Sequence, residues 1–91
     1  MFTESSPYWY LTMREPVKNP PVLESTSPPC ENTQVVGCYN IENKQVHIKV
    51  PTKDYACTLH HEKLHACGWM HRTDFIPTNR DTYCGWSIPL C

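Results

Sequence analysis

The sequence predicts an α+β fold in which a β-hairpin or small antiparallel sheet packs against one helix and is followed by a disulfide-rich, irregular tail. An alternating polar and apolar stretch precedes one segment of helical character, and 6 cysteines fall within only 91 residues. A net charge of −1 excludes a nucleic-acid binder that works through a basic face, and no apolar run is long enough to span a membrane. We therefore expect one small domain with a modest core.

The first 29 residues are expected to form an extended, Pro-rich N-terminal segment that precedes a domain of residues 30–91. This segment contains 6 of the 9 prolines and no glycine. Because proline fixes φ and lacks an N–H donor, residues 16–29 should be extended and largely unpaired. An aromatic cluster at residues 8–10 lies just before them, and we expect it to dock on the domain or to face a partner.

A β-hairpin is predicted over residues 33–50. Its second arm is Gln45–Val50, in which polar and apolar residues alternate, and Asn40–Lys44 forms the polar turn. Pro51 ends the second arm, because proline cannot donate to a strand ladder.

One helix is predicted over Tyr55–Cys67, a stretch without glycine or proline. Thr52 or Asp54 can cap its start, and Gly68 stands where a C-terminal residue with positive φ is expected. Residues 69–91 contain several prolines and turn residues, so we expect an irregular tail held by its cysteines.

The cysteine content predicts three disulfides. Cys57 and Cys67 lie ten residues apart on the expected helix, about 15 Å along its axis, and cannot bond each other. We expect Cys57 to pair on the hairpin side and Cys67 to pair in the tail. The six residues concerned are Cys30, Cys38, Cys57, Cys67, Cys84 and Cys91.

Three disulfides imply an oxidising compartment, so we expect an extracellular or periplasmic protein, although the sequence opens without a signal segment. The alternative is a reduced cytosolic protein in which the cysteines form a second metal site. Zinc-finger spacing does not favour that alternative, because the chain has no C-x-x-C pair.

Residues 61–71 contain the pattern H-E-x-x-H-x-x-G-x-x-H. At about 100° per residue, His61 and His65 lie one turn apart on the same helix face, with Glu62 beside them. Gly68 permits a sharp turn after which His71 can return as a third ligand. Three neutral imidazoles leave the fourth tetrahedral position of zinc open, as a catalytic site requires. Chance would produce these five fixed positions in such a chain with a probability on the order of three in 100,000.

This segment resembles the zinc-binding signature of the metzincin metallopeptidases. The resemblance implies one zinc ion per chain, bound by His61, His65 and His71. It also implies that Glu62 is the general base that activates a zinc-bound water for hydrolysis of peptide bonds in a peptide or protein substrate. We expect the protein to act as a monomer.

The resemblance further implies an edge strand that holds extended substrate, and Gln45–Val50 is the matching segment, with Val46 and Ile48 as substrate-binding residues. The resemblance also makes Tyr83 the candidate oxyanion stabiliser, because some family members use a tyrosine downstream of the third histidine. The alternative is that Tyr83 is a packed aromatic residue beside Cys84. The methionine turn of this family is missing or replaced, and the chain is too short for a five-stranded sheet. We therefore expect a minimal zincin-like domain.

The remaining polar residues near the motif have simpler interpretations. His60 should face solvent, and His47 is expected to be an ordinary strand histidine. Asp74 is either a turn residue or a hydrogen-bond partner for a ligand imidazole. The alternative function is a non-enzymatic, zinc-binding and disulfide-stabilised protein-interaction module. In that case the three histidines serve folding and Glu62 has no use.

Overall fold

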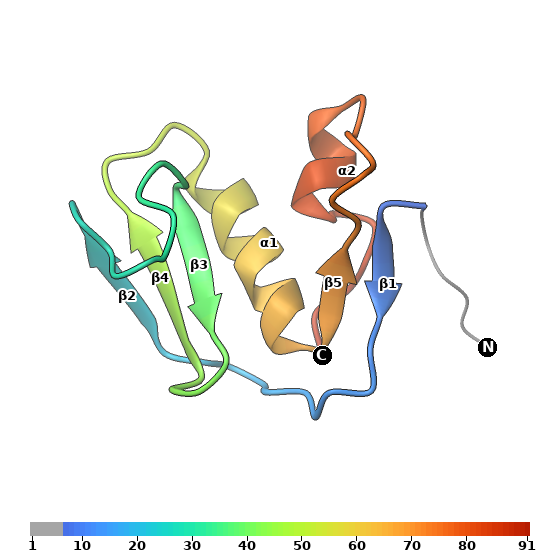
Figure 1. The fold of residues 1–91 in the computed structure, drawn as a ribbon, viewed down its shortest axis with the longest axis horizontal. Helices are drawn as coiled ribbons and strands as arrows, with labels where there is room; N and C mark the ends of the chain where they lie inside the picture. The colour runs from blue at the N-terminus through green and yellow to red at the C-terminus, as the bar shows by residue number, and fades with distance from the viewer. Residues whose placement is uncertain (1–6) are drawn as a thin grey trace.

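The computed structural model describes residues 7–91 and places a central helix, α1 (Tyr55–Ala66), between two small sheets (Figure 1). A three-stranded sheet lies on one side of α1. A two-stranded sheet and a short second helix, α2 (Arg80–Cys84), lie on the other side. The α+β class predicted from the sequence is confirmed, whereas a zincin-like fold stays a prediction.

The three-stranded sheet contains the predicted hairpin and one strand that was not predicted. Its strands, in spatial order, are β2 (Val22–Ser25), β4 (Gln45–Lys49) and β3 (Gly37–Asn40). β3 and β4 are antiparallel, which confirms the hairpin, and β2 runs parallel to β4. The expectation that residues 16–29 are largely unpaired is therefore wrong. The four residues of β2 contain no proline, so their N–H groups are free to pair.

The sheet order also corrects the predicted edge strand. β4 is the central strand and pairs on both sides, and its Val46 and Ile48 side chains are fully buried. Neither its backbone nor these two side chains can receive a substrate. The edge nearer to α1 belongs to β3 (Figure 1).

The two-stranded sheet joins the N-terminal segment to the residues that follow α1. β1 (Trp9–Leu11) pairs antiparallel with β5 (Trp69–His71), so that Trp9 lies opposite His71. The aromatic cluster at residues 8–10 therefore docks on the domain, with Tyr8 and Trp9 buried. The first six residues of the expected N-terminal segment lie outside the described part of the chain.

The tail beyond α1 is not wholly irregular, because it contains β5 and α2. α2 begins after Asn79, whose side chain accepts a hydrogen bond from the Thr82 N–H at 2.8 Å. It ends at Gly85, which has a φ of 72°. An Asn cap and a terminal glycine are ordinary helix boundary signals, which the proline-rich surroundings obscured.

α1 matches its prediction to within one residue. It is followed by Cys67 and by Gly68, whose φ of 102° confirms the expected turn. Asp54 occupies the N-cap position, but its side chain does not cap the helix. Its carboxylate instead forms an ion pair with Arg80 at 2.8 Å, which links the start of α1 to the start of α2.

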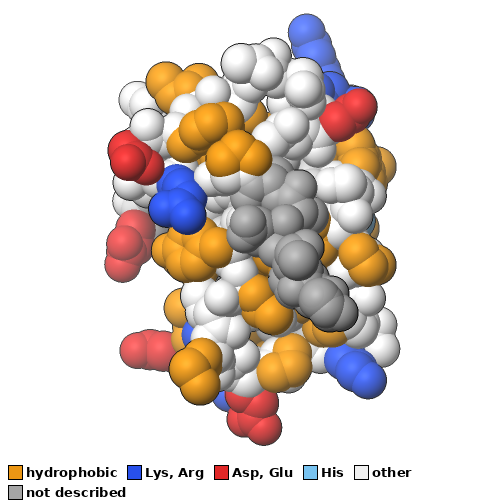
Figure 2. Space-filling model, turned by 90° about the vertical axis from the view of Figure 1, so that its right-hand side faces the viewer, with side chains coloured by type: hydrophobic (Ala, Val, Ile, Leu, Met, Phe, Trp, Pro, Cys, Tyr) orange, Lys and Arg blue, Asp and Glu red, His pale blue; other side chains and the backbone are white. Residues whose placement is uncertain are grey.

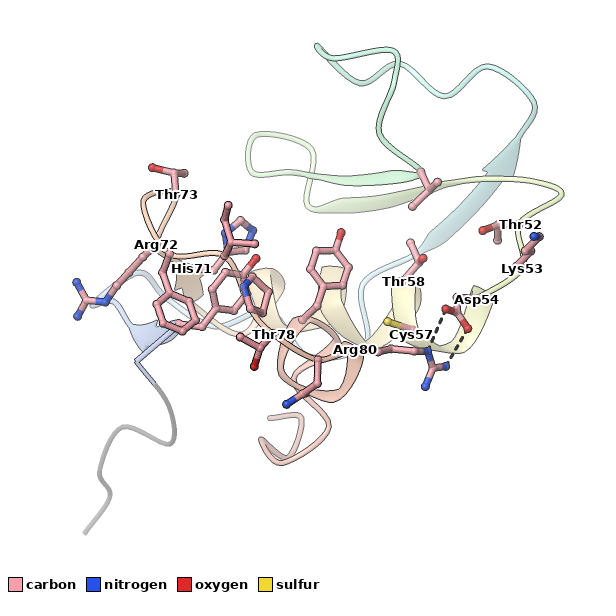
Figure 3. Close-up of a pocket in the computed structure, with 17 residues that line it drawn as sticks. Thr52, Lys53, Asp54, Cys57, Thr58, His71, Arg72, Thr73, Thr78 and Arg80 are labelled. Carbon is pink, nitrogen blue, oxygen red and sulfur yellow. Dashed lines mark hydrogen bonds and ion pairs between the residues drawn. The ribbon is translucent and has the colours of Figure 1, made fainter.

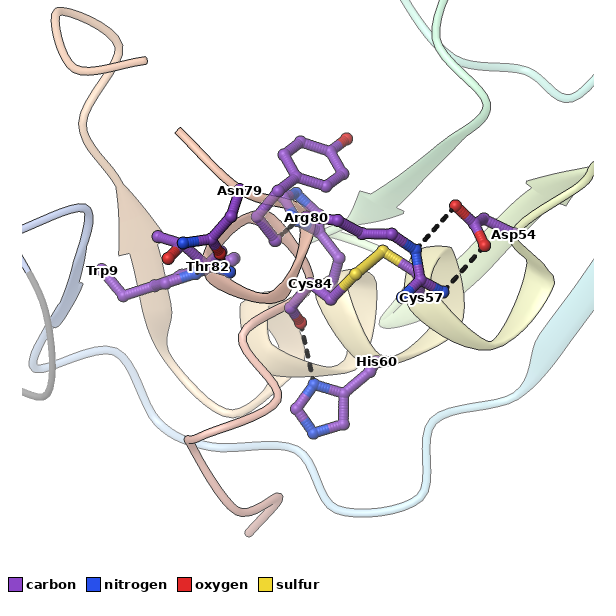
Figure 4. The surroundings of a disulfide bond; sticks show 10 residues. Trp9, Asp54, Cys57, His60, Asn79, Arg80, Thr82 and Cys84 are labelled. Atoms are coloured by element: carbon purple, nitrogen blue, oxygen red, sulfur yellow. Dashed lines mark hydrogen bonds and ion pairs between the residues drawn. A yellow bond between two sulfur atoms is a disulfide. The ribbon is translucent and has the colours of Figure 1, made fainter. Parts of the chain in front are cut away.

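The chain contains three disulfides, as predicted, and has no free cysteine within residues 7–91: the pairs are Cys30–Cys38, Cys57–Cys84 and Cys67–Cys91. The expectation that Cys57 pairs on the hairpin side is wrong, because α2 brings Cys84 to a Cα–Cα distance of 4.9 Å (Figure 4). Cys67 does pair in the tail. Three disulfides in so short a chain are typical of extracellular proteins.

The main apolar core lies between α1 and the two-stranded sheet. It comprises Tyr8, Trp9, Leu64, Cys67, Trp69 and Ile88. A protein of this size cannot cover all its apolar atoms, and such side chains reach the surface on the side of β1 and β5 (Figure 2). None of the helices between residues 7 and 91 is long and apolar enough to cross a bilayer.

Candidate metal centre

Three histidines converge where α1 and β5 meet. His61 and His65 project from α1, and His71 is the last residue of β5. One nitrogen of each ring lies within 4.8 Å of the other two, and the ring centroids are 5.0–5.1 Å apart. Nitrogens that bind one tetrahedral zinc ion at about 2.0–2.1 Å lie about 3.3 Å apart. Small side-chain rotations would therefore bring the three rings onto one ion.

Backbone carbonyl groups orient the two imidazoles of α1. His61 Nδ1 lies 2.8 Å from the carbonyl oxygen of Tyr83, and His65 Nδ1 lies 3.0 Å from that of Trp69. A carbonyl oxygen only accepts hydrogen bonds, so both rings carry their proton on Nδ1. This tautomer leaves Nε2 unprotonated and available as a metal ligand.

His71 is held differently from the other two histidines. The ring of Tyr8 stacks on its imidazole with a centroid distance of 4.9 Å and an interplanar angle of 4°. Its Nδ1 atom is buried and has no hydrogen-bond partner among residues 7–91. A buried polar atom without a partner is destabilising, and direct coordination of a cation by this atom would remove that penalty.

Burial keeps the three imidazoles uncharged at neutral pH. It lowers the pKa of His61 to about 3 and that of His65 to about 4, and it also lowers the pKa of His71. Metal ions bind the neutral imidazole. The cluster can therefore accept a cation near pH 7 without first losing protons.

Glu62 is a buried carboxyl group next to this cluster. Its side chain is only 6% exposed, and burial raises its pKa to about 8. The carboxyl group lines the same cavity as the three histidines. A cation in the site would lower this pKa, because a nearby positive charge favours the carboxylate.

Tyr83 belongs to the site as well. Its ring stacks on His61 with a centroid distance of 4.4 Å and an interplanar angle of 23°. Burial and the neighbouring Glu62 both raise the pKa of its hydroxyl, which therefore remains a hydrogen-bond donor at neutral pH. Packing against His61 and a role in the cavity are thus compatible for this residue.

Two adjoining cavities open around the cluster. One, of about 880 Å³, is lined by the three histidines, Glu62 and the residues of β3. The other, of about 1050 Å³, extends from His71 past Tyr83 toward the Asp54–Arg80 pair (Figure 3). Because Val36, His71 and Tyr83 line both, the two hollows form one groove that passes the histidines.

Other predicted residues lie outside the cluster. His60 is partly buried rather than solvent-facing, and its Nδ1 donates to the carbonyl of Cys84 at 2.9 Å (Figure 4). His47 is a buried strand residue of β4. Asp74 is exposed and makes no hydrogen bond to an imidazole within the described chain, so its interpretation as a turn residue is the better one.

Sequence reasoning missed three residues around the cluster. Tyr8 and Trp9 come from the N-terminal segment and contact the imidazoles directly. Arg14 lines the cavity, and its guanidinium lies 3.6 Å from the sulfur of Met70. The aromatic run at residues 8–10 indicated docking, but nothing local indicated where it docks.

No protein-family model, curated protein or solved structure matches this chain. The chemistry of the site must therefore be inferred from its own residues.

Proposed function

We propose that the protein is a zinc-dependent metallopeptidase with a minimal, zincin-like domain. One observation carries the proposal: a buried carboxyl group, Glu62, lies beside three converging neutral imidazoles in a groove that is also lined by β3. Three nitrogen ligands suit zinc and leave a coordination position free. Secretion into an oxidising compartment agrees with the three disulfides.

His61, His65 and His71 would hold the zinc ion, which would polarise a scissile carbonyl and acidify a water molecule. Glu62 would accept a proton from the water that attacks the carbonyl carbon. It would then return the proton to the amine nitrogen while the C–N bond breaks. Tyr83 donates a hydrogen bond from its hydroxyl to the carbonyl oxygen as negative charge develops there.

The edge of β3 supplies a surface for extended substrate. The Lys49 N–H donates to the Val36 carbonyl at 2.8 Å, and Gly37 pairs with Ile48. Since hydrogen-bonded pairs alternate along an antiparallel ladder, the N–H and C=O groups of Gly37 and Tyr39 point away from β4. This edge lines the groove beside the histidines, so an extended peptide could add to the sheet there.

The position of Glu62 favours an enzyme over a purely structural zinc module. Three histidines suffice to hold a structural ion, whereas burial of a carboxyl group whose pKa rises to about 8 destabilises the metal-free fold at neutral pH. A site selected for stability alone would gain from an uncharged residue at this position. A general base needs the carboxyl group.

The test is cleavage of a broad peptide library by the zinc-loaded protein. Glu62→Gln keeps the size of the side chain and should still bind one zinc ion, but we expect its cleavage rate to fall by about 10²–10⁴-fold. His65→Ala should lose the zinc ion. Glu15→Gln is the matched control, because it makes the same change at an exposed carboxyl group that lies outside both the cluster and the groove.

The outcomes distinguish the two functions. Cleavage by the wild type that disappears in Glu62→Gln with zinc retained establishes the peptidase. Zinc bound in both proteins with no cleavage by either would refute it and favour the structural module.

A further inference from the structure

The indole ring of Trp9 lies against all three imidazoles of the cluster. Its centroid is 4.9 Å from that of His61, 5.4 Å from that of His65 and 5.2 Å from that of His71. The planes meet at 53–89°, so the rings pack in tilted and edge-to-face arrangements. Trp9 is only 1% exposed, and all three imidazole rings pack against its indole ring.

Contacts with α2 and with β5 fix the position of the Trp9 indole ring. Trp9 Nε1 donates to the carbonyl of Thr82 in α2 at 2.8 Å (Figure 4). The next carbonyl along α2, that of Tyr83, accepts from His61 Nδ1. On the other side, the β1–β5 pairing sets Trp9 opposite His71. The same two elements that orient the ligands thus also orient the indole.

A glycine makes this close approach possible. Gly85 ends α2, and a Cβ added there would lie 3.3 Å from Trp9 Nε1 and would collide with the Leu64 side chain. The C-terminal end of α2 can therefore lie directly against the indole, and the Thr82 carbonyl group reaches Trp9 Nε1.

We propose that Trp9 is a positioning residue of the metal centre. This role rests on the metal site proposed above and goes beyond it, because it assigns part of that site to the N-terminal segment. An imidazole packed on a rigid ring has fewer accessible rotamers, so it loses less conformational entropy when a cation binds. One indole in contact with three ligands restricts all of them together.

Trp9 also belongs to the apolar core, so the test must separate positioning from core packing. Ile88 is the matched control, since it belongs to the same core cluster and is 3% exposed. Ile88→Ala removes core volume through a residue that is not an aromatic neighbour of the ligands. Trp9→Leu removes the ring, and Trp9→Phe keeps a smaller ring but removes the bond to the Thr82 carbonyl.

The measurements are zinc affinity by competition with a chromophoric chelator, the visible absorption spectrum of the Co²⁺-loaded protein, and thermal melting. Residues that support metal ligands typically change metal affinity by about 10–100-fold. We expect Trp9→Leu to lose affinity in that range and to alter the Co²⁺ spectrum, with Trp9→Phe between it and the wild type. Ile88→Ala should melt at a lower temperature but keep the wild-type affinity and spectrum.

Equal affinities and spectra for Trp9→Leu and Ile88→Ala would overturn the role of Trp9 while leaving the metal site intact. If Trp9→Leu does not fold, Trp9→Phe decides, and wild-type affinity and spectrum in that variant would overturn the role. Absence of metal binding in the wild type would instead overturn the metal centre, and the positioning role with it.

Discussion

Burial of Glu62 should make the stability of the metal-free protein depend on pH in a way that one substitution removes. The side chain is 6% exposed, and its pKa rises from 4.5 to about 8 because burial disfavours the carboxylate. The folded state therefore binds a proton that the unfolded state releases, from about pH 4.5 upward. Stability is lost as the pH rises through this window, and the loss is complete above about pH 8.

The size of this loss of stability follows from the shift in the pKa of Glu62. Each pKa unit corresponds to about 1.4 kcal/mol, so at pH 7 the penalty is about 3 kcal/mol, and it approaches about 5 kcal/mol above pH 8. Glu62→Gln, which cannot ionise, avoids this penalty. For a domain of this length 1 kcal/mol corresponds to about 4–8 °C in melting temperature. We therefore expect metal-free Glu62→Gln to melt well above the metal-free wild type at pH 8 and at nearly the same temperature at pH 4.

The assay is thermal melting of both proteins in chelator, with disulfides intact, at pH 4, 6 and 8. The histidines are common to both proteins, so their own titration cancels in the difference. Glu42→Gln is the control, because it makes the same change at a side chain that is exposed in the hairpin turn. A difference between Glu62→Gln and wild type that is the same at pH 4 and pH 8 would refute the reasoning, since it would mean that Glu62 ionises freely in the folded protein.

Three further predictions concern the parts that hold the site. Gly37→Ala should destabilise the fold by about 1–3 kcal/mol in urea unfolding, because the added Cβ would lie 2.9 Å from Thr58 Cγ2; an unchanged midpoint would contradict the close packing of β3 on α1. Removal of the Cys57–Cys84 disulfide by a double serine substitution should cost roughly 3–4 kcal/mol and weaken zinc binding, whereas removal of the Cys30–Cys38 disulfide should leave zinc affinity close to that of the wild type. Chelation of zinc should lower the melting temperature of the wild type but not that of His65→Ala, and an equal shift in both would show that the ion binds elsewhere.

The parts of the site that could be predicted from the sequence are those set by local geometry. Helical periodicity alone places His61 and His65 on one face of α1, and Gly68 provides the turn that brings His71 back. The hairpin was also predicted from local sequence, by the alternation of polar and apolar residues in Gln45–Val50. Each of these features depends on residues that lie close together in the sequence.

The parts that could not be predicted depend on contacts between distant segments. The local sequence of neither strand indicates the parallel pairing of β2 with β4. This pairing makes β4 a central strand instead of an edge strand. Trp9 reaches the histidines from more than 50 positions earlier in the chain, and its neighbours indicate only that this segment docks on the domain or faces a partner. The partner of Cys57 depends on α2, a helix of five residues whose boundary signals lie among prolines.

α2 explains how so short a chain can orient a site of this kind. A helix leaves its last carbonyl groups without partners in the helix. Here the successive carbonyls of Thr82, Tyr83 and Cys84 accept hydrogen bonds from Trp9, His61 and His60. The C-terminal end of one short helix thus fixes His61, a proposed metal ligand, and the indole ring that packs against it, and the Cys57–Cys84 disulfide holds that helix against α1. Because the same bonds stabilise the fold and orient the imidazoles, loosening α2 should weaken metal binding and folding together.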